Sequence, residues 1–166
     1  MGKERIEVFA NIYKAAAKSL KETAEKVAEE TRLHQIAEGK GHPLWQMGHL
    51  SWAHDFIINQ WFLGGESVIS AEYSAVFAPE VMKGKTPTAK ASDYPSWDEV
   101  MESYDKACAR TIELIEGLSD EDLPGGLRGD VSERARSHFG NMGEALMMMS
   151  LHDAHHRGQI ALIDAL

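Results

Sequence analysis

The residues best suited to chemistry lie near the C-terminus, where His152 and His156 are four positions apart. Side chains four residues apart on an α-helix project from the same face, one turn from each other. Two imidazoles placed in this way can bind a single metal ion. With eight histidines in 166 residues, however, such a pair can arise by chance, and a buried histidine can also be satisfied by a carbonyl or a carboxylate. The pair alone leaves both interpretations open.

The surrounding apolar pattern favours the metal-binding interpretation. Met149 and Ile163 lie on the same arc of the expected helix as His152 and His156, and this arc faces the core. Burial of two imidazoles without partners costs free energy, which a bound metal ion offsets. His155 is rotated by about 100° from His156, so we expect it to be partly exposed and not to be a ligand.

A third ligand must come from another helix, and His49 is the best candidate. It shares a face with Trp45, Trp52 and Phe56, which is the apolar side of the second expected helix. The alternative role for His49 is that of a core histidine that donates to a backbone carbonyl. His54 lies about 140° further round the same helix, so we expect it to face elsewhere. Two other histidines sit at the end of a helix or before one: His34 and His42.

Four long segments with helical periodicity can position these side chains. Apolar residues recur every three or four positions in each segment, and charged residues fill the intervening positions of the first. Capping boxes mark the start of the last two segments, Ser96 with Glu99 and Asn141 with Glu144. The expected helices span residues 3–36, 43–62, 97–118 and 141–165.

Two long connections separate these helices, residues 64–96 and residues 119–140. A structureless loop as long as the first is unusual in a compact domain, so we expect a short helix near residues 70–77. We expect the second connection to be irregular. No segment of useful length alternates like a β-strand. The expected fold is therefore all-α, a four-helix bundle with two long connections that forms a single domain over residues 1–166.

Composition excludes several classes of partner. No stretch approaches the 18 or more apolar residues of a membrane helix, and the N-terminus lacks the apolar core of a signal peptide. The net charge of −9 argues against binding to nucleic acid, which depends on phosphate neutralisation. The one cysteine, Cys108, excludes an internal disulfide framework. We therefore expect a cytoplasmic protein with neither a nucleic-acid nor a membrane partner.

Two segments of the chain resemble motifs of the DinB-like (YfiT-like) superfamily of metal-dependent enzymes. Residues 43–52, with Gly48-His49-Leu50 at their centre, resemble the motif of the second helix, and residues 152–160 closely resemble that of the fourth. Residues 118–123 are also in the style of this family. The resemblance implies a four-helix bundle in which three histidines bind a divalent metal ion, zinc or nickel. Carried over by position, these ligands are His49, His152 and His156, whereas His54 and His155 have no counterpart in the motifs.

The resemblance also implies a function. Members of this superfamily are usually homodimers, and those with known activity use low-molecular-weight thiols such as mycothiol, bacillithiol or glutathione in S-transfer or isomerisation. We therefore expect a divalent-metal-dependent transferase that combines a small-molecule substrate with such a thiol. The alternatives are a non-catalytic metal- or ligand-binding bundle, a metal-dependent hydrolase, and a dimerisation domain with structural histidines. The sequence does not decide between catalysis and binding.

Four further residues have expected roles around this site. Three imidazoles leave the ion open to water or substrate, and their rings need partners that orient them. Gln46 and Gln159 lie on the faces that carry the ligands and are candidates for that role. Arg157 can bind an anionic substrate or bridge a subunit interface, and we favour the interface. Cys108 is expected to be buried in the third long helix, so the attacking sulfur must come from a cosubstrate.

Overall fold

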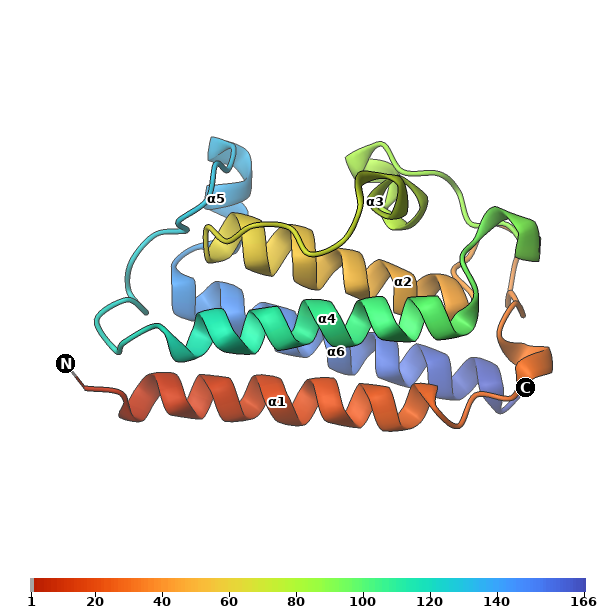
Figure 1. Ribbon diagram of the computed structural model, residues 1–166, viewed down its shortest axis with the longest axis horizontal. Helices are drawn as coiled ribbons and strands as arrows, with labels where there is room; N and C mark the ends of the chain where they lie inside the picture. Colours follow the sequence, from red (N-terminus) through yellow and green to blue (C-terminus); the bar gives the residue numbers. More distant parts are fainter. Residues whose placement is uncertain (1) are drawn as a thin grey trace.

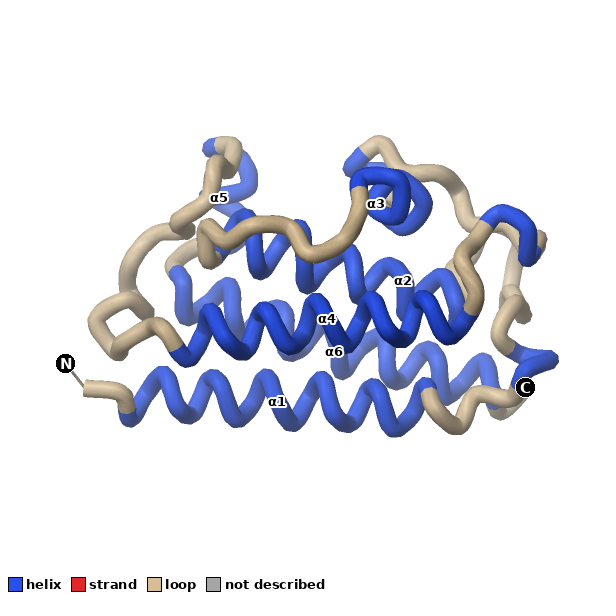
Figure 2. Tube along the Cα trace, viewed as in Figure 1, coloured by secondary structure: helices blue, strands red, loops and turns tan. Residues whose placement is uncertain are grey.

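The computed structural model describes residues 2–166, and all its regular elements are helical (Figures 1 and 2). Within this range there is no β-strand, so the expected all-α class is confirmed. The α-helices are α1 (Glu4–Ala24), α2 (Pro43–Trp52), α3 (Ala71–Phe77), α4 (Trp97–Glu116), α5 (Glu133–Phe139) and α6 (Met142–Asp164). The π-helix η2 (Ala53–Phe62) continues α2, and short 3₁₀ helices are η1 (Glu29–Thr31), η3 (Glu80–Met82) and η4 (Ala91–Asp93).

Four long helical segments lie side by side: α1, α2 with η2, α4, and α6 (Figure 1). The short helices α3 and α5 belong to the two long connections and lie on the side of the molecule where α2 runs. The core is formed between the long segments, where helix α1 contributes Ile6, Tyr13 and Leu20 at helical spacing. None of the helices between residues 2 and 166 is both long and apolar enough to cross a membrane.

Helix α2 occupies the centre of the fold. Every residue of α2 except Trp45 is buried, as expected for a helix that is apolar around much of its circumference. Its start is fixed by Pro43 at the first helical position and by His42, whose side-chain Nδ1 accepts a hydrogen bond from the backbone N–H of Trp45. Because α2 has almost no exposed face, each polar side chain on it must find a partner inside the protein.

The segment Pro43–Phe62 has the predicted bounds, but its second half is a π-helix that the sequence did not predict. The N–H of Leu63 donates to the carbonyl of Ile58, five residues back, in the pattern that defines this helix. Gly64 ends the helix with a positive φ of 68°, as expected. The N–H groups of Arg128 and Gly129 then satisfy the last free carbonyls of η2, those of Phe62 and Trp61.

The first helix is shorter than predicted. We expected it to span residues 3–36, but α1 ends at Ala24 and only the short η1 follows. The reason is a carboxylate at the far end of α6: Asp164 Oδ1 accepts hydrogen bonds from the backbone N–H of Ala28 and from Thr31 Oγ1. In a continuing helix the N–H of Ala28 would donate to the carbonyl four residues back. This tertiary contact replaces that bond and turns the chain toward α2.

The two connections differ from each other in how well they were predicted. The short helix expected near residues 70–77 is present as α3, capped by the side chain of Ser70. The second connection was expected to be irregular, and this was wrong because it contains α5, capped by Ser132. Both predicted capping boxes are present, at the start of α4 and of α6.

Candidate metal centre

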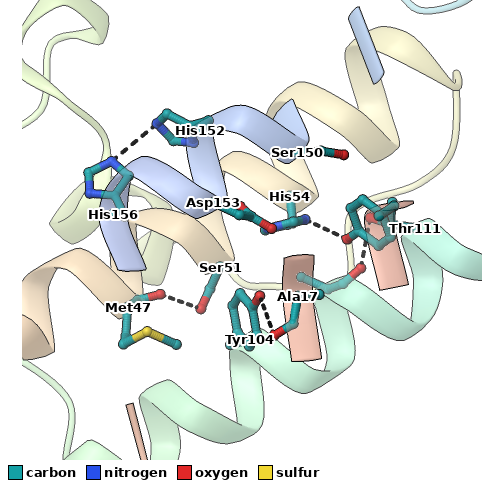
Figure 3. Close-up of polar contacts among 12 residues, drawn as sticks. Ala17, Met47, Ser51, His54, Tyr104, Thr111, Ser150, His152, Asp153 and His156 are labelled. Atoms are coloured by element: carbon teal, nitrogen blue, oxygen red, sulfur yellow. Dashed lines mark hydrogen bonds and ion pairs between the residues drawn. The ribbon is translucent and has the colours of Figure 1, made fainter. Parts of the chain in front are cut away.

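The structure brings His49, His152 and His156 together between α2 and α6. One ring nitrogen of each histidine lies within 4.8 Å of those of the other two. The ring centroids are 5.5 Å apart for His49 and His152, 5.4 Å for His49 and His156, and 4.6 Å for His152 and His156. Figure 3 shows the two α6 histidines, with a dashed line joining their rings. We call these three residues the histidine cluster.

The position of His49 depends on the residue before it. A Cβ added to Gly48 would lie within 2.5 Å of three atoms of the Phe77 ring. Only glycine therefore lets α3 pack this closely against α2. The close packing places the carbonyl of Phe77 3.2 Å from His49 Nδ1. A carbonyl oxygen can only accept, so Nδ1 carries the proton and Nε2 of His49 has a free lone pair.

Two indole rings hold the imidazole of His49 from either side. The Trp45 ring stacks on the His49 ring with centroids 4.9 Å apart and an interplanar angle of 3°. The Trp52 ring also stacks on the His49 ring, with centroids 5.5 Å apart and an angle of 23°. Residues three and four positions away on a helix lie on the same face, which explains why these side chains meet. The stack limits rotation of the His49 ring and fixes the direction of Nε2.

Gln46 fixes the second imidazole, as its place on the ligand face predicted. Its Nε2 donates to the carbonyl of Gly41 at 2.9 Å, so its Oε1 is the atom that faces His156 Nδ1 at 3.2 Å. His156 therefore carries its proton on Nδ1 and has a free lone pair on Nε2, as His49 does. Gln159, the other candidate, lines the same cavity as His156.

The spacing of the cluster fits a metal ion. His152 Nε2 and His156 Nε2 are 3.2 Å apart. Two nitrogens that bind one tetrahedral ion at 2.0–2.1 Å are about 3.3 Å apart. His152 Nδ1 is buried without a hydrogen-bond partner among residues 2–166. The three side chains thus supply nitrogen donors only, which suits zinc or nickel, and they leave coordination positions for other ligands.

All three imidazoles are held in the neutral form that metal binding requires. Burial lowers the pKa of His49 to about 4 and that of His152 to about 4. The pKa of His156 is lowered to about 2, first by burial and then by the neighbouring His152 and His49. Each imidazole disfavours a positive charge on the others, and for His152 the neighbouring Asp153 acts in the opposite direction without reversing the net lowering of the pKa.

The other histidines have separate roles or none at this site. His155 is exposed, as predicted from its angle on the helix, and His34 is exposed between η1 and α2. His42 caps α2, and its Nε2 donates to the carbonyl of Thr88. Arg157 donates to Ser19 Oγ on α1, so within one chain it joins two helices. Cys108 is buried on α4 as expected, and burial raises its pKa to about 12.

Sequence reasoning missed a buried polar group next to the cluster. His54 of η2 faces away from the cluster, as expected, but it is fully buried and lies beside Asp153 (Figure 3). Its hydrogen bonds join α1 to α6. Its Nδ1 is 2.5 Å from Tyr13 Oη, and its Nε2 is 2.9 Å from Asp153 Oδ1. Asp153 directly follows His152 and is fully buried. The signal was the place of His54 on the apolar second segment, where a buried polar residue needs a partner inside the protein.

A family model for the DinB superfamily matches residues 12–160 of the chain. The chain belongs to the DinB superfamily. The resemblance seen in the motifs of the second and fourth long helices is thereby confirmed. The range matched by the DinB model includes all three residues of the histidine cluster. No curated protein matches the chain.

Within this DinB chain, the arrangement can hold an ion and leave one side of it accessible. Three neutral imidazoles with open coordination positions are typical of catalytic sites, whereas structural zinc sites use four protein ligands. A cavity of about 240 Å³ has His156 in its lining, so a small molecule can reach the cluster from that side. The geometry therefore supports metal-assisted chemistry on a small ligand.

Proposed function

We propose that this protein is a divalent-metal-dependent transferase that uses a low-molecular-weight thiol, with His49, His152 and His156 as ligands of zinc or nickel. The observation that carries the proposal is the convergence of three neutral imidazoles, two of them held by Phe77 and Gln46 with the Nε2 lone pair free. When bound, such an ion lowers the pKa of a coordinated thiol or water, so that the thiol or water can lose its proton at neutral pH.

The chain's own residues prepare the site for such an ion. Trp45 and Trp52 restrict the ring of His49, and Gln46 orients His156, so the donors need little rearrangement to bind. Burial of the cluster excludes water from one side and strengthens electrostatic interactions there. Cys108 is buried with its pKa raised to about 12, which makes it a poor nucleophile. The sulfur must therefore come from a cosubstrate.

Thiol turnover tests this function. The zinc- or nickel-loaded protein is incubated with glutathione, bacillithiol or mycothiol and a panel of electrophiles, and loss of the free thiol is followed. We expect turnover with at least one pair, and its loss in His49→Ala. The matched control is His155→Ala, which removes an exposed histidine next to the cluster. Turnover that persists in His49→Ala would refute the proposal.

Two alternatives give different results in the same experiment. A non-catalytic metal- or ligand-binding protein would bind the ion and turn over no thiol, and its stability would rise with ligand concentration. A metal-dependent hydrolase would consume an ester or amide without any thiol. The transferase is preferred because it follows from the resemblance of both helical motifs together with the donor set of the cluster.

We also propose that the four long helices act as one four-helix-bundle domain spanning the chain and that this domain works in the cytoplasm, where thiols are kept reduced. A homodimer is supported by exposed apolar side chains on the adjacent helices α1 and α6: Val8, Ile12, Met147 and Leu151. Leu151 is 64% exposed, and an exposed apolar patch favours association. Leu151→Glu should give a monomer by light scattering, whereas Val81→Glu, at an exposed site in η3, should not.

A further inference from the structure

The cavity next to the histidine cluster has a composition that indicates what it binds. It has a volume of about 240 Å³ and lies between the segment after η1, the start of α2 and the end of α6. Its lining includes Ile36, Lys40, Trp45, His156, Leu162 and Ile163. We call it the Lys40 hollow. The cavity is smaller than the 300–1,000 Å³ typical of pockets for drug-sized ligands, so it suits a small molecule.

The walls of the Lys40 hollow are mostly apolar, with Gln46 and Gln159 beside His156, and are partly open to solvent. Ile36 is 56% exposed and Leu162 is 59% exposed, although both are large apolar side chains. Trp45 also lines the hollow and is half-buried. When an apolar ligand covers exposed apolar side chains in a concave site, the removal of their surface from water favours binding. The hollow therefore favours a ligand with an apolar body.

The charge of the hollow is positive although the chain carries a net charge of −9. Lys40 is its one charged lining residue among those that the structure describes. Within residues 2–166, Lys40 has no carboxylate close enough for an ion pair. The ammonium group is therefore available to a ligand. An ammonium beside apolar walls pairs best with a single anionic group on an otherwise apolar molecule.

We propose that the Lys40 hollow binds small monocarboxylates with an apolar chain, and that Lys40 and Leu162 determine this specificity. The inference rests on the proposed function in one respect: the bound molecule is taken to be the substrate presented to the metal centre at His156. Lys40 pairs with the carboxylate, and Ile36, Leu162 and Ile163 cover the chain. The class of substrate is thus set by residues outside the histidine cluster.

Binding of octanoate and of its neutral analogue octanamide tests the proposal. Both are titrated by NMR against the metal-free and the zinc-loaded protein. Octanoate should bind both forms of the protein. When hexanoate is titrated as a shorter reference, the affinity should rise about fourfold for each added methylene. Lys40→Gln should weaken octanoate about two- to fivefold and leave octanamide unchanged. Leu162→Gln should weaken both ligands.

A second lysine provides the matched control. Lys85 lies in an adjoining hollow that shares Lys40, Gly41 and Trp45 but does not contain His156. Lys85→Gln makes the same change of charge close by, and it should leave the affinity for octanoate unchanged. A loss in Lys85→Gln equal to that in Lys40→Gln would overturn the proposal, because the anion would then lie in the adjoining hollow.

Two further results would overturn the proposal. Binding of octanoate to the zinc-loaded protein alone would mean that the carboxylate is a metal ligand and not a partner of Lys40. Equal loss of octanoate and octanamide in Lys40→Gln would mean that Lys40 contributes packing alone. Failure of the metal site is distinguishable, because His49→Ala should lose zinc and still bind octanoate with wild-type affinity.

Discussion

Gly48→Ala tests whether the close packing of α3 against α2 positions His49. The added Cβ would lie within 2.5 Å of three ring atoms of Phe77, where carbon atoms normally sit about 3.5–4.0 Å apart. The ring must therefore move by about 1 Å or more. Because Phe77 also supplies the carbonyl that accepts from His49 Nδ1, the movement weakens the bond that fixes this ligand.

The contributions of this substitution to the free energy of unfolding have opposite signs. Alanine is favoured over glycine inside a helix by about 1 kcal/mol, whereas overpacking costs about 1–3 kcal/mol. Weakening of the hydrogen bond adds about 0.5–1.5 kcal/mol. The net effect on the free energy of unfolding is a loss of about 1–3 kcal/mol. The effect on zinc affinity is larger, a 10- to 100-fold loss, because the partner of a ligand is disturbed.

Both quantities can be measured on the same samples. Zinc affinity is obtained by competition with a chromophoric chelator, and the free energy of unfolding by urea denaturation of the metal-free protein. The control is Gly158→Ala on α6, two residues after His156, where an added Cβ meets nothing within 4 Å. This control should be stabilised by about 1 kcal/mol and should bind zinc normally. Wild-type zinc affinity in Gly48→Ala would refute the reasoning about Phe77.

Three more predictions concern the surroundings of the cluster. Gln46→Met keeps the volume of the side chain but removes Oε1 from His156 Nδ1, and should lower zinc affinity about 10-fold or more in the chelator assay, with little change in fold by circular dichroism. Asp153→Ala leaves His54 Nε2 without its partner inside the core and should cost about 3 kcal/mol in urea denaturation, against about 0.5 kcal/mol or less for the exposed Asp130→Ala. In the folded protein the pKa of His49 and that of His152 are lowered from the ordinary value of 6.5 to about 4. Between these two values the unfolded chain binds more protons than the folded protein, so the metal-free protein must lose stability as pH falls from 6.5 toward 4. The loss should be about 1 kcal/mol per buried histidine at pH 5.5. Equal melting temperatures at pH 7.5 and 5.5 would contradict it.

The long helices could be predicted because each carries its own local signals. The capping boxes at Ser96 and Asn141 and the helix start at Pro43 depend on residues within one turn of the helix end. The end of α1 could not be predicted in this way, because it depends on Asp164, a residue 136 positions from Ala28. Helix α5 does have a local cap in Ser132, but the proline and the glycines of its connection favour an irregular segment.

The candidate site was predictable to the extent that helical angle decides burial. The angle between His155 and its neighbours placed it in solvent, and the face shared with Trp45 placed His49 in the core. The angle alone could not reveal the partners of His54, because Tyr13 and Asp153 come from two other helices. The role of Gly48 was equally hidden, since it depends on how closely α3 packs.

The most direct test of the account is the metal content of the purified protein and of four single variants, measured by elemental analysis at neutral pH after loading with zinc and desalting. The account predicts about one ion per chain for the wild type and for His155→Ala. It predicts loss of that ion in His49→Ala, His152→Ala and His156→Ala, with each variant still helical by circular dichroism. Folded variants that keep the ion, or a wild type that binds none, would contradict the claim that these three histidines form a metal centre.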